Sequence, residues 1–209
     1  MRYRRIALVV AAILVVLGVE WAWLKGSSDD PPPVTIAPAA APGGPFTLVD
    51  HRGREVTDVD FRGKYVIMVF GYTFCPDVCP TTLSKVAAAM DLLGPKAENV
   101  VPVFVTVDPE RDTPEVLAAY VAAFHPRMVG LTGSPEQIRQ IARNYRVYYA
   151  KPETGEADYL VDHSAYVYLI GPDGRVLSYL KHDATPAAMA AAITEVMARR
   201  TARAAAPGA

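Results

Sequence analysis

The sequence predicts an α/β domain in which helices flank a mixed central sheet. Two continuous apolar runs, at residues 64–72 and 100–107, are typical of strands that are buried on both faces. Helix-start signals follow these runs in alternation, and a hairpin and a last helix complete the pattern. Strands that alternate with helices in this way indicate a layered α/β architecture.

The strands are predicted in order along the chain. Residues 46–50 and 55–59 are expected to form a small hairpin at the start of the domain. The two buried strands come next. A third apolar run at 165–170 leads through a Gly-Pro-Asp-Gly turn at 171–174 into a strand at 175–180.

Three helices are expected to begin where a hydroxyl residue precedes a proline. A hydroxyl oxygen caps the helix and proline suits the first helical position. The second of these helices also has Gln137, which completes a capping box. By the same pattern Cys79, before Pro80, is expected to cap a helix over 80–93. The three hydroxyl–proline pairs are Thr113-Pro114, Ser134-Pro135 and Thr185-Pro186.

Length and composition limit the classes of function. A chain of 209 residues, 51% of them hydrophobic, suits one globular domain with attachments. The formal net charge of -1 provides no long-range attraction for nucleic acid. We therefore predict no nucleic-acid partner.

Residues 1–24 are predicted to be a transmembrane anchor. Arginines precede a segment at 6–24 that is apolar except for Glu20 and that as a helix would be roughly 28 Å long at about 1.5 Å per residue. Trp21 and Trp23 suit the membrane interface, and the positive-inside rule places the domain on the extracytoplasmic side, periplasmic or equivalent. The alternative is a signal peptide, but the small-residue stretch at 39–41 is far from the apolar core.

The remaining chain divides by composition. Residues 25–44 are rich in Pro, Ala and Gly and are expected to be an extended linker. The folded domain is expected at 45–200, and residues 201–209 are expected to be a disordered tail.

The cysteines Cys75 and Cys79 are expected on the loop from a buried strand into a helix. A disulfide between them would close almost no loop and would stabilise the fold little. Thiol–disulfide exchange and metal binding remain as alternatives. Helix N–H groups are expected to lower the pKa of a thiol here. Two thiolates suit Cu(I), zinc or an iron–sulfur cluster, but structural zinc and clusters usually require four ligands.

Three segments carry a resemblance to a known family. They are GYTFCPDVCP at 71–80, VDPERDTP at 107–114 and DHSA at 162–165. Together they resemble the Sco/SenC family, which comprises thioredoxin-fold copper proteins that help to assemble the binuclear copper centre of cytochrome c oxidase. The resemblance implies a thioredoxin-like fold for this chain. It also implies that copper, as Cu(I) or Cu(II), binds Cys75, Cys79 and His163.

The position of His163 agrees with this assignment, because it precedes a buried strand and should lie at an end of the sheet. The other histidines, His51, His125 and His182, have ordinary surface or helix-end interpretations.

Two groups near these motifs carry weaker hypotheses. Asp162 is a candidate to orient His163, although adjacent side chains in a strand point apart. The segment 108–112 is either an acidic turn that faces a partner or a loop that leads into the helix at Thr113.

The predicted function is that of a copper metallochaperone. Its expected partners are the copper-bearing subunit of cytochrome c oxidase, other copper chaperones and, through the anchor, a membrane. The alternative is a metal-independent thiol–disulfide oxidoreductase or peroxidase, with Cys75 and Cys79 as catalytic residues. Against it, three residues separate the cysteines instead of the usual two, and exchange does not require His163. A third interpretation is an interaction domain with an incidental disulfide.

Overall fold

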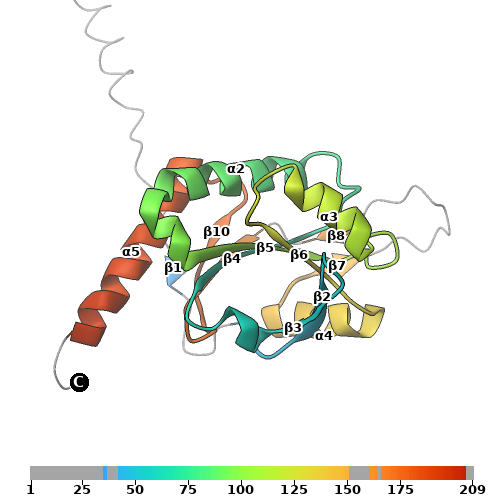
Figure 1. The fold of residues 1–209 in the computed structure, drawn as a ribbon, viewed down its shortest axis with the longest axis horizontal. Coiled ribbons are helices and arrows are strands. Elements are labelled where there is room, and N and C mark those ends of the chain that lie inside the picture. The colour runs from blue at the N-terminus through green and yellow to red at the C-terminus, as the bar shows by residue number, and fades with distance from the viewer. Residues whose placement is uncertain (1–34, 37–41, 151–160, 164–165, 206–209) are drawn as a thin grey trace, which may run out of the picture. The chain divides into compact units, whose positions relative to one another are not determined.

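A computed structural model of the chain describes residues 35–36, 42–150, 161–163 and 166–205. These residues form a mixed sheet with helices on both faces, which confirms the predicted fold class (Figure 1). The sheet has the order β1-β10-β9-β4-β5-β6-β2-β3. Its strands are β1 (Thr35–Ile36), β2 (Thr47–Asp50), β3 (Glu55–Thr57), β4 (Tyr65–Gly71), β5 (Val100–Thr106), β6 (Val129–Thr132), β9 (Tyr166–Ile170) and β10 (Val176–Lys181).

The centre of the sheet is parallel and its outer parts are antiparallel. β5 pairs in parallel with both β4 and β6, whereas β9 runs antiparallel to β4. Every residue of β4 is buried, and successive side chains enter the two cores alternately, as a pleated strand requires. This explains why the strand is a continuous apolar run in the sequence.

Helices cover both faces. The core on one face includes residues of α2 (Val78–Leu93), α3 (Pro114–Ala122) and α5 (Pro186–Ala205). The core on the other face includes residues of α4 (Pro135–Tyr145), and Figure 1 shows α2 and α4 on opposite sides of the sheet. Two 3₁₀ segments, η1 (Asp58–Phe61) and η2 (Gly94–Asn99), and a small pair, β7 (Tyr149–Ala150) with β8 (Asp162–His163), complete the described elements.

The three hydroxyl–proline helix starts are confirmed. The hydroxyl oxygens accept hydrogen bonds from backbone N–H groups three residues ahead, at 3.4, 3.2 and 3.2 Å. In α4 the side chain of Gln137 also accepts from the backbone N–H of Ser134, which completes the predicted capping box. The capping residues are Thr113, Ser134 and Thr185.

The predicted start of the fourth helix is wrong. Asp77 is the N-cap and α2 begins at Val78, so Cys79 lies within the first turn and not at the cap. Pro80 is then the third helical residue. Proline is tolerated there because the first N–H groups of a helix have no intrahelical acceptor in any case.

Other elements differ from the predicted boundaries. β6, β7 and β8 are strands that the sequence patterns did not indicate, and β1 lies within the segment predicted as a linker. The backbone N–H of Gly43, also in that segment, donates to the carbonyl of Asn144 at 2.7 Å. α5 continues to Ala205, so it extends into the segment 201–209 that was predicted as a tail.

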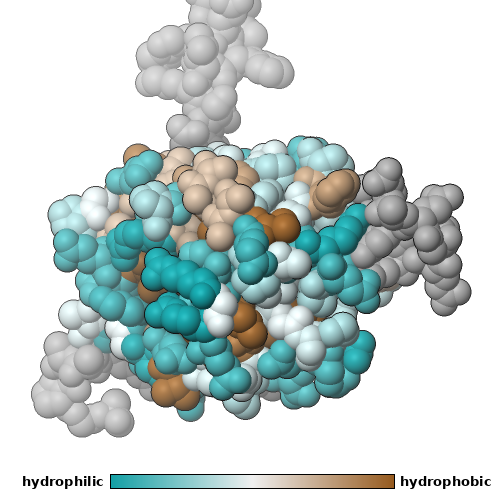
Figure 2. Space-filling view, turned by 45° about the vertical axis from the view of Figure 1, so that its right-hand side comes forward, coloured by the Kyte–Doolittle hydropathy of each residue, from teal (hydrophilic) through white to brown (hydrophobic). Residues whose placement is uncertain are grey.

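By compactness the chain divides into Met1–Pro31 and Pro32–Ala209, and all described residues belong to the second unit. The predicted anchor at 1–24 therefore lies outside the described residues. None of the helices within the described part is long and apolar enough to cross a bilayer. The face in Figure 2 is mostly hydrophilic, and its hydrophobic residues form small separate patches.

Candidate metal centre

The loop that carries both cysteines connects the centre of the sheet to α2. It leaves β4 after Gly71 and enters the helix at Val78. β4 lies between β9 and β5 in the sheet, and the carboxyl end of such a central strand is where α/β proteins commonly place their functional groups. The backbone N–H of Cys75 donates to the carbonyl of Tyr72 at 3.2 Å, which folds the loop back on itself.

The two cysteines lie together, as the sequence predicted. The backbone N–H of Cys79 donates to the Sγ atom of Cys75 at 3.4 Å. Cys79 is 1% exposed and Cys75 is partly exposed, and no disulfide joins them in this structure. One cysteine is therefore partly accessible from solvent, whereas the other lies in the protein interior.

Gly71 creates the space that the buried sulfur occupies. A Cβ atom at this position would lie 2.5 Å from Sγ of Cys79 and 3.0 Å from the ring of Phe104. Both distances are shorter than ordinary van der Waals contact, so any side chain at residue 71 would displace the sulfur or the ring. The last residue of β4 thus allows the first turn of α2 to approach the sheet.

The electrostatic environment of Cys79 differs from the expected one. We predicted that the helix N-terminus lowers the pKa of a thiol at this site. Instead, a hydrogen bond with the Cys75 side chain and burial raise the pKa of Cys79 well above its ordinary value. A hydrogen bond from the backbone of Tyr72 opposes this shift only in part. The prediction fails because the hydrogen bond with Cys75, together with burial of the sulfur against the sheet, favours the protonated thiol of Cys79.

The chain returns to the cysteine loop just before His163. Burial raises the pKa of Tyr72, and a hydrogen bond from the backbone of Val161 opposes that shift. Val161 is buried in the same core as Tyr72 and is followed directly by β8. β8 pairs with β7 so that His163 is opposite Tyr149. The strand of His163 therefore begins beside the cysteine loop.

The side chains of Asp162 and His163 lie outside the described part of the structure. Within the described side chains, no group of three or more His, Cys, Asp or Glu residues is arranged to hold a metal. The structure thus brings together the two cysteines and places the backbone of the third predicted ligand in β8.

The competing histidines have other contacts. Nδ1 of His51 accepts from the backbone N–H of Gly130, and Nδ1 of His125 accepts from that of Arg127, both at 3.1 Å. The carbonyl of His182 accepts from the ammonium group of Lys85. The first two contacts are with backbone N–H groups outside the cysteine loop.

In the segment 108–112, Asp108 and Asp112 are both 0% exposed and so do not face a partner, whereas Glu110 is exposed. The segment leads into α3, as the alternative hypothesis stated. Asp112 accepts hydrogen bonds from Thr73 in the cysteine loop, and Arg111 lies over the ring of Phe74 in the same loop. These contacts belong to the site, and the sequence patterns did not reveal them.

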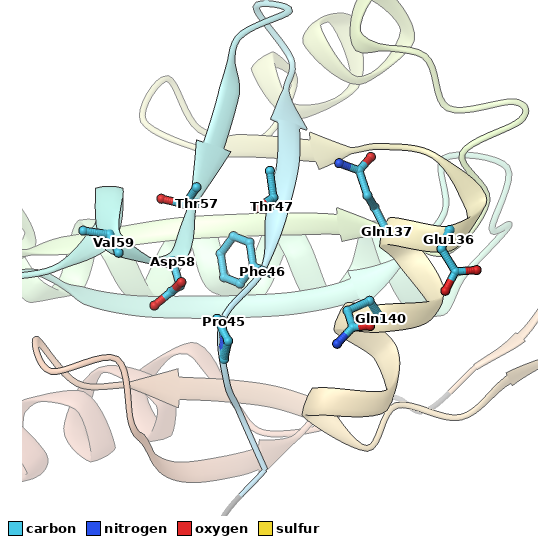
Figure 3. Close-up of a pocket in the computed structure, with 9 residues that line it drawn as sticks. All are labelled: Pro45, Phe46, Thr47, Thr57, Asp58, Val59, Glu136, Gln137 and Gln140. Carbon is cyan, nitrogen blue, oxygen red and sulfur yellow. The ribbon is translucent and has the colours of Figure 1, made fainter.

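A separate groove of about 460 Å³ lies between the β2–η1 region and α4 (Figure 3). Asp58 and Glu136 line it, together with hydroxyl, amide and apolar side chains. None of its lining residues is a cysteine or a histidine. This groove is therefore not part of the cysteine site.

The fold and the site define a class of protein: a thioredoxin-like α/β domain with a pair of adjacent cysteine thiols after a central strand. The chain belongs to the SCO1/SenC family, whose family model matches residues 34–198.

The chain is similar in sequence to the mitochondrial protein SCO1 homolog 1 of Arabidopsis thaliana. The two are 53% identical over 135 residues, which are 64% of this chain and 40% of that relative. This chain thus matches less than half the length of that relative.

Solved structures agree with this family. Arabidopsis thaliana ScoI with copper bound has a TM-score of 0.72 and 44% identity, and the match covers 76% of this chain and 99% of that one. BsSco is described as a member of the Sco family of cytochrome c oxidase assembly proteins in which a disulfide switch was identified. It has a TM-score of 0.58 and 28% identity, and the match covers 76% of this chain and 98% of that one.

Proposed function

We propose that this chain binds copper through Cys75, Cys79 and His163 and delivers it to the copper-bearing subunit of a cytochrome c oxidase. The observation that carries the proposal is the contact between the two cysteines, beside the point at which the chain reaches the strand of His163. Two thiols and an imidazole are soft and intermediate ligands, a set that suits copper better than magnesium or calcium. The copper in a related ScoI structure also supports it.

Cys79 and Cys75 have different roles in this proposal. Cys79 is buried and would hold copper from the interior, whereas Cys75 is partly exposed and accessible to a partner. A carrier must release its metal, and an accessible ligand allows a partner's ligand to replace it stepwise. Both sulfurs bind copper as thiolates, so copper must displace the protons of the two thiols.

The test is to measure copper in the purified protein after expression with copper. Cys75→Ser and Cys79→Ser should each abolish tight binding, because a hydroxyl is a poor ligand for Cu(I). His163→Ala should weaken binding and change the Cu(II) spectrum. His125→Ala is the matched control, since His125 contacts the backbone of Arg127. The same copper content in the parent and in both cysteine variants would overturn the proposal.

A second candidate function is reduction of cysteines in the partner. The contact of Cys79 N–H with Cys75 Sγ favours it, because a pair so arranged is close to disulfide formation. The partly exposed Cys75 would attack the partner disulfide, and Cys79 would then displace the partner thiol. Measured turnover of a partner disulfide that His163→Ala does not slow would favour this function over copper delivery.

A further inference from the structure

Asp112 is a buried carboxylate whose hydrogen-bond donors come from two different segments. It is 0% exposed. Its Oδ1 atom accepts from the hydroxyl of Thr73 at 2.5 Å, and its Oδ2 atom accepts from the backbone N–H of the same residue at 3.0 Å. Oδ2 also accepts from the hydroxyl of Thr106 at 2.6 Å. The carboxylate thus joins residues far apart in the sequence.

These donors connect the cysteine loop to the sheet. Thr73 lies in the loop between β4 and α2, two residues before Cys75, and Thr106 is the last residue of β5. Because Asp112 binds both the backbone and the side chain of Thr73, it fixes the position and the orientation of that residue. Two residues of chain span at most about 7 Å, so Cys75 stays within that distance of the attachment at Thr73.

Two neighbours of Asp112 strengthen the attachment. The guanidinium of Arg111 lies 4.9 Å from the ring centre of Phe74 and 5.7 Å from that of Tyr72. Its Nε atom donates to Asp108 at 2.5 Å, and the backbone N–H of Asp108 donates to the hydroxyl of Thr106 at 2.9 Å. The segment 108–112 therefore contacts three successive residues of the cysteine loop.

Burial of a carboxylate is costly, and a connection between a loop and a strand does not require a charge. A carboxylate has the advantage that it accepts several hydrogen bonds at once in a fixed geometry. We propose that Asp112 is a positioning residue that holds the loop so that Cys75 stays beside Cys79. Asp112 would thereby increase the affinity for copper and set the stability of a Cys75–Cys79 disulfide. The inference rests on the proposed copper function, but the expected effect on the Cys75–Cys79 disulfide does not require copper.

The first test is Asp112→Asn. Asparagine offers one acceptor oxygen, and its NH₂ group cannot accept from the backbone N–H of Thr73. Cu(I) affinity should fall about tenfold, as is typical when a group that supports a ligand is removed. The equilibrium with oxidised glutathione should shift about threefold or more toward the reduced protein, because Cys75 is no longer held beside Cys79. In that reaction Cys75 and Cys79 form a disulfide and lose two electrons and two protons, and glutathione disulfide becomes two glutathione thiols.

A second pair of variants keeps the test decisive if Asp112→Asn does not fold. Thr73→Val removes the hydroxyl donor and preserves the backbone N–H, so it should shift both equilibria in the same direction as Asp112→Asn. Thr73→Ser restores the donor and should return both equilibria toward the parent values. If the contact between Asp112 and Thr73 affected only the stability of the fold, Thr73→Ser would not return the glutathione equilibrium toward the parent value.

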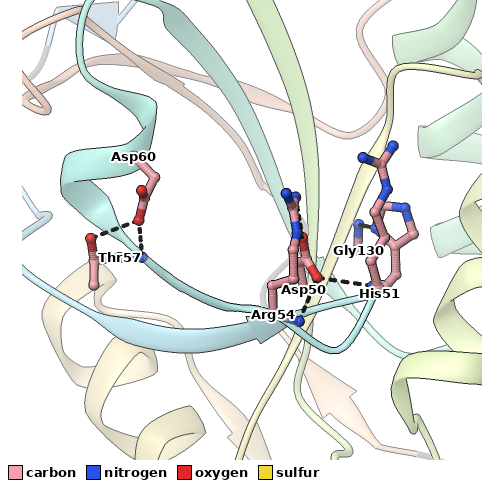
Figure 4. A network of polar contacts seen from close by, with 7 residues as sticks. Asp50, His51, Arg54, Thr57, Asp60 and Gly130 are labelled. Carbon is pink, nitrogen blue, oxygen red and sulfur yellow. Dashed lines mark hydrogen bonds and ion pairs between the residues drawn. The ribbon is translucent and has the colours of Figure 1, made fainter.

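Asp50→Asn is the matched control. Asp50 is another buried aspartate, 1% exposed, and it accepts from Arg54 in the β2–β3 turn (Figure 4). It should lower stability and leave both equilibria within about twofold of the parent, as expected for an independent site. The inference is overturned if Thr73→Val leaves both equilibria unchanged. It is also overturned if Asp50→Asn shifts them as much as Asp112→Asn or Thr73→Val does. If the parent binds no copper, the proposed function fails and the glutathione equilibrium still tests the positioning role.

Discussion

At the scale of single residues, Gly71 determines how close the first turn of α2 comes to the sheet. The absence of a side chain leaves room for Sγ of Cys79 directly against the backbone of β4. The backbone of a glycine is often required where another group approaches a strand closely. Here the approaching group is a proposed copper ligand, so the glycine links the packing of the strand to the chemistry of the site.

We expect Gly71→Ala to impair the site more than the fold. The added methyl carbon would lie 2.5 Å from Sγ of Cys79, so the sulfur must move. Overpacking of this kind costs about 1–3 kcal/mol in stability. Copper affinity should fall by more than tenfold, because changes that disturb the support of a metal ligand typically cost about 10- to 100-fold in affinity. Titration with copper and chemical denaturation of the same samples would measure both effects.

Gly130→Ala is the control for this substitution. A Cβ atom at Gly130 would lie 3.1 Å from side-chain atoms of Leu117 and Val121, with no sulfur among its three nearest atoms. It should reduce stability and leave copper affinity unchanged. Equal copper affinity in Gly71→Ala and the parent would show that the position of the Cys79 sulfur does not matter for binding.

The two cysteines also predict that oxidation prevents copper binding. A Cys75–Cys79 disulfide leaves neither sulfur as a thiolate, and thiolates are the form that binds copper. Reduced protein should therefore bind one copper and oxidised protein none at this site. Bound copper should in turn slow oxidation, because it occupies both sulfurs. Copper titrations of the two forms at one pH provide the measurement, and equal affinities would contradict the ligand assignment.

At the scale of elements, helix starts were predictable where the signal is local. Ser134 and Gln137 form a capping box because both partners lie within one turn. The start of α2 was placed incorrectly because Pro80 suits more than the first helical position. β6 was missed because its four residues, one of them a glycine, do not form a long apolar run.

The residues of the candidate site, like the helix starts, were predictable only where the signal in the sequence is local. The sequence indicated Cys75 and Cys79 through their spacing and the family motif. The contact of Asp112 with Thr73 joins residues 39 positions apart, and no local pattern predicts it. A signal was nevertheless available in the two aspartates of 108–112 directly after a buried strand. The pKa of Cys79 was predicted in the wrong direction because the hydrogen bond with Cys75 and the burial that raise it are properties of the tertiary structure.

The β2–β3 turn provides a prediction about stability and pH. Burial raises the pKa of Asp50, but hydrogen bonds from Arg54 and from the backbone of Arg52 outweigh it and hold the pKa below its ordinary value. A carboxyl group with a lowered pKa stabilises the folded state above its unfolded pKa, and this contribution disappears as the pH falls through the folded pKa. The parent should therefore lose this contribution in acid.

Asp50→Asn should test this contribution directly. At pH 7 the variant should be less stable than the parent by about 1–2 kcal/mol, because hydrogen bonds to a charged acceptor are lost. The difference between the two proteins should shrink below about pH 4, where the carboxyl group of the unfolded parent takes up a proton before the folded one, whose pKa is lower. Chemical denaturation from pH 7 to pH 3 measures it. A difference that stays constant with pH would contradict the assigned role of the Asp50 charge.

At the scale of the whole molecule, the topology explains how distant segments contribute to one site. β4 and β5 are adjacent and parallel, so the loops after Gly71 and Thr106 leave the same edge of the sheet. The backbone of Val161 then meets Tyr72 at that edge. The cysteine loop, the segment 108–112 and the start of β8 are thereby brought together from separate parts of the chain.

The remaining question at this scale is how the domain is held in place, and the sequence predicts an uncleaved anchor. A charge in the middle of the apolar segment, as in Val15→Lys, should cost about 2.5–3.5 kcal/mol on insertion. The parent should remain in membranes after an alkaline wash and keep its original N-terminus, whereas Val15→Lys should be largely released. Val34→Lys, the same change in the predicted linker, should behave as the parent does. A parent that is found in the soluble fraction, with an N-terminus between residues 26 and 44, would instead identify a cleaved signal peptide.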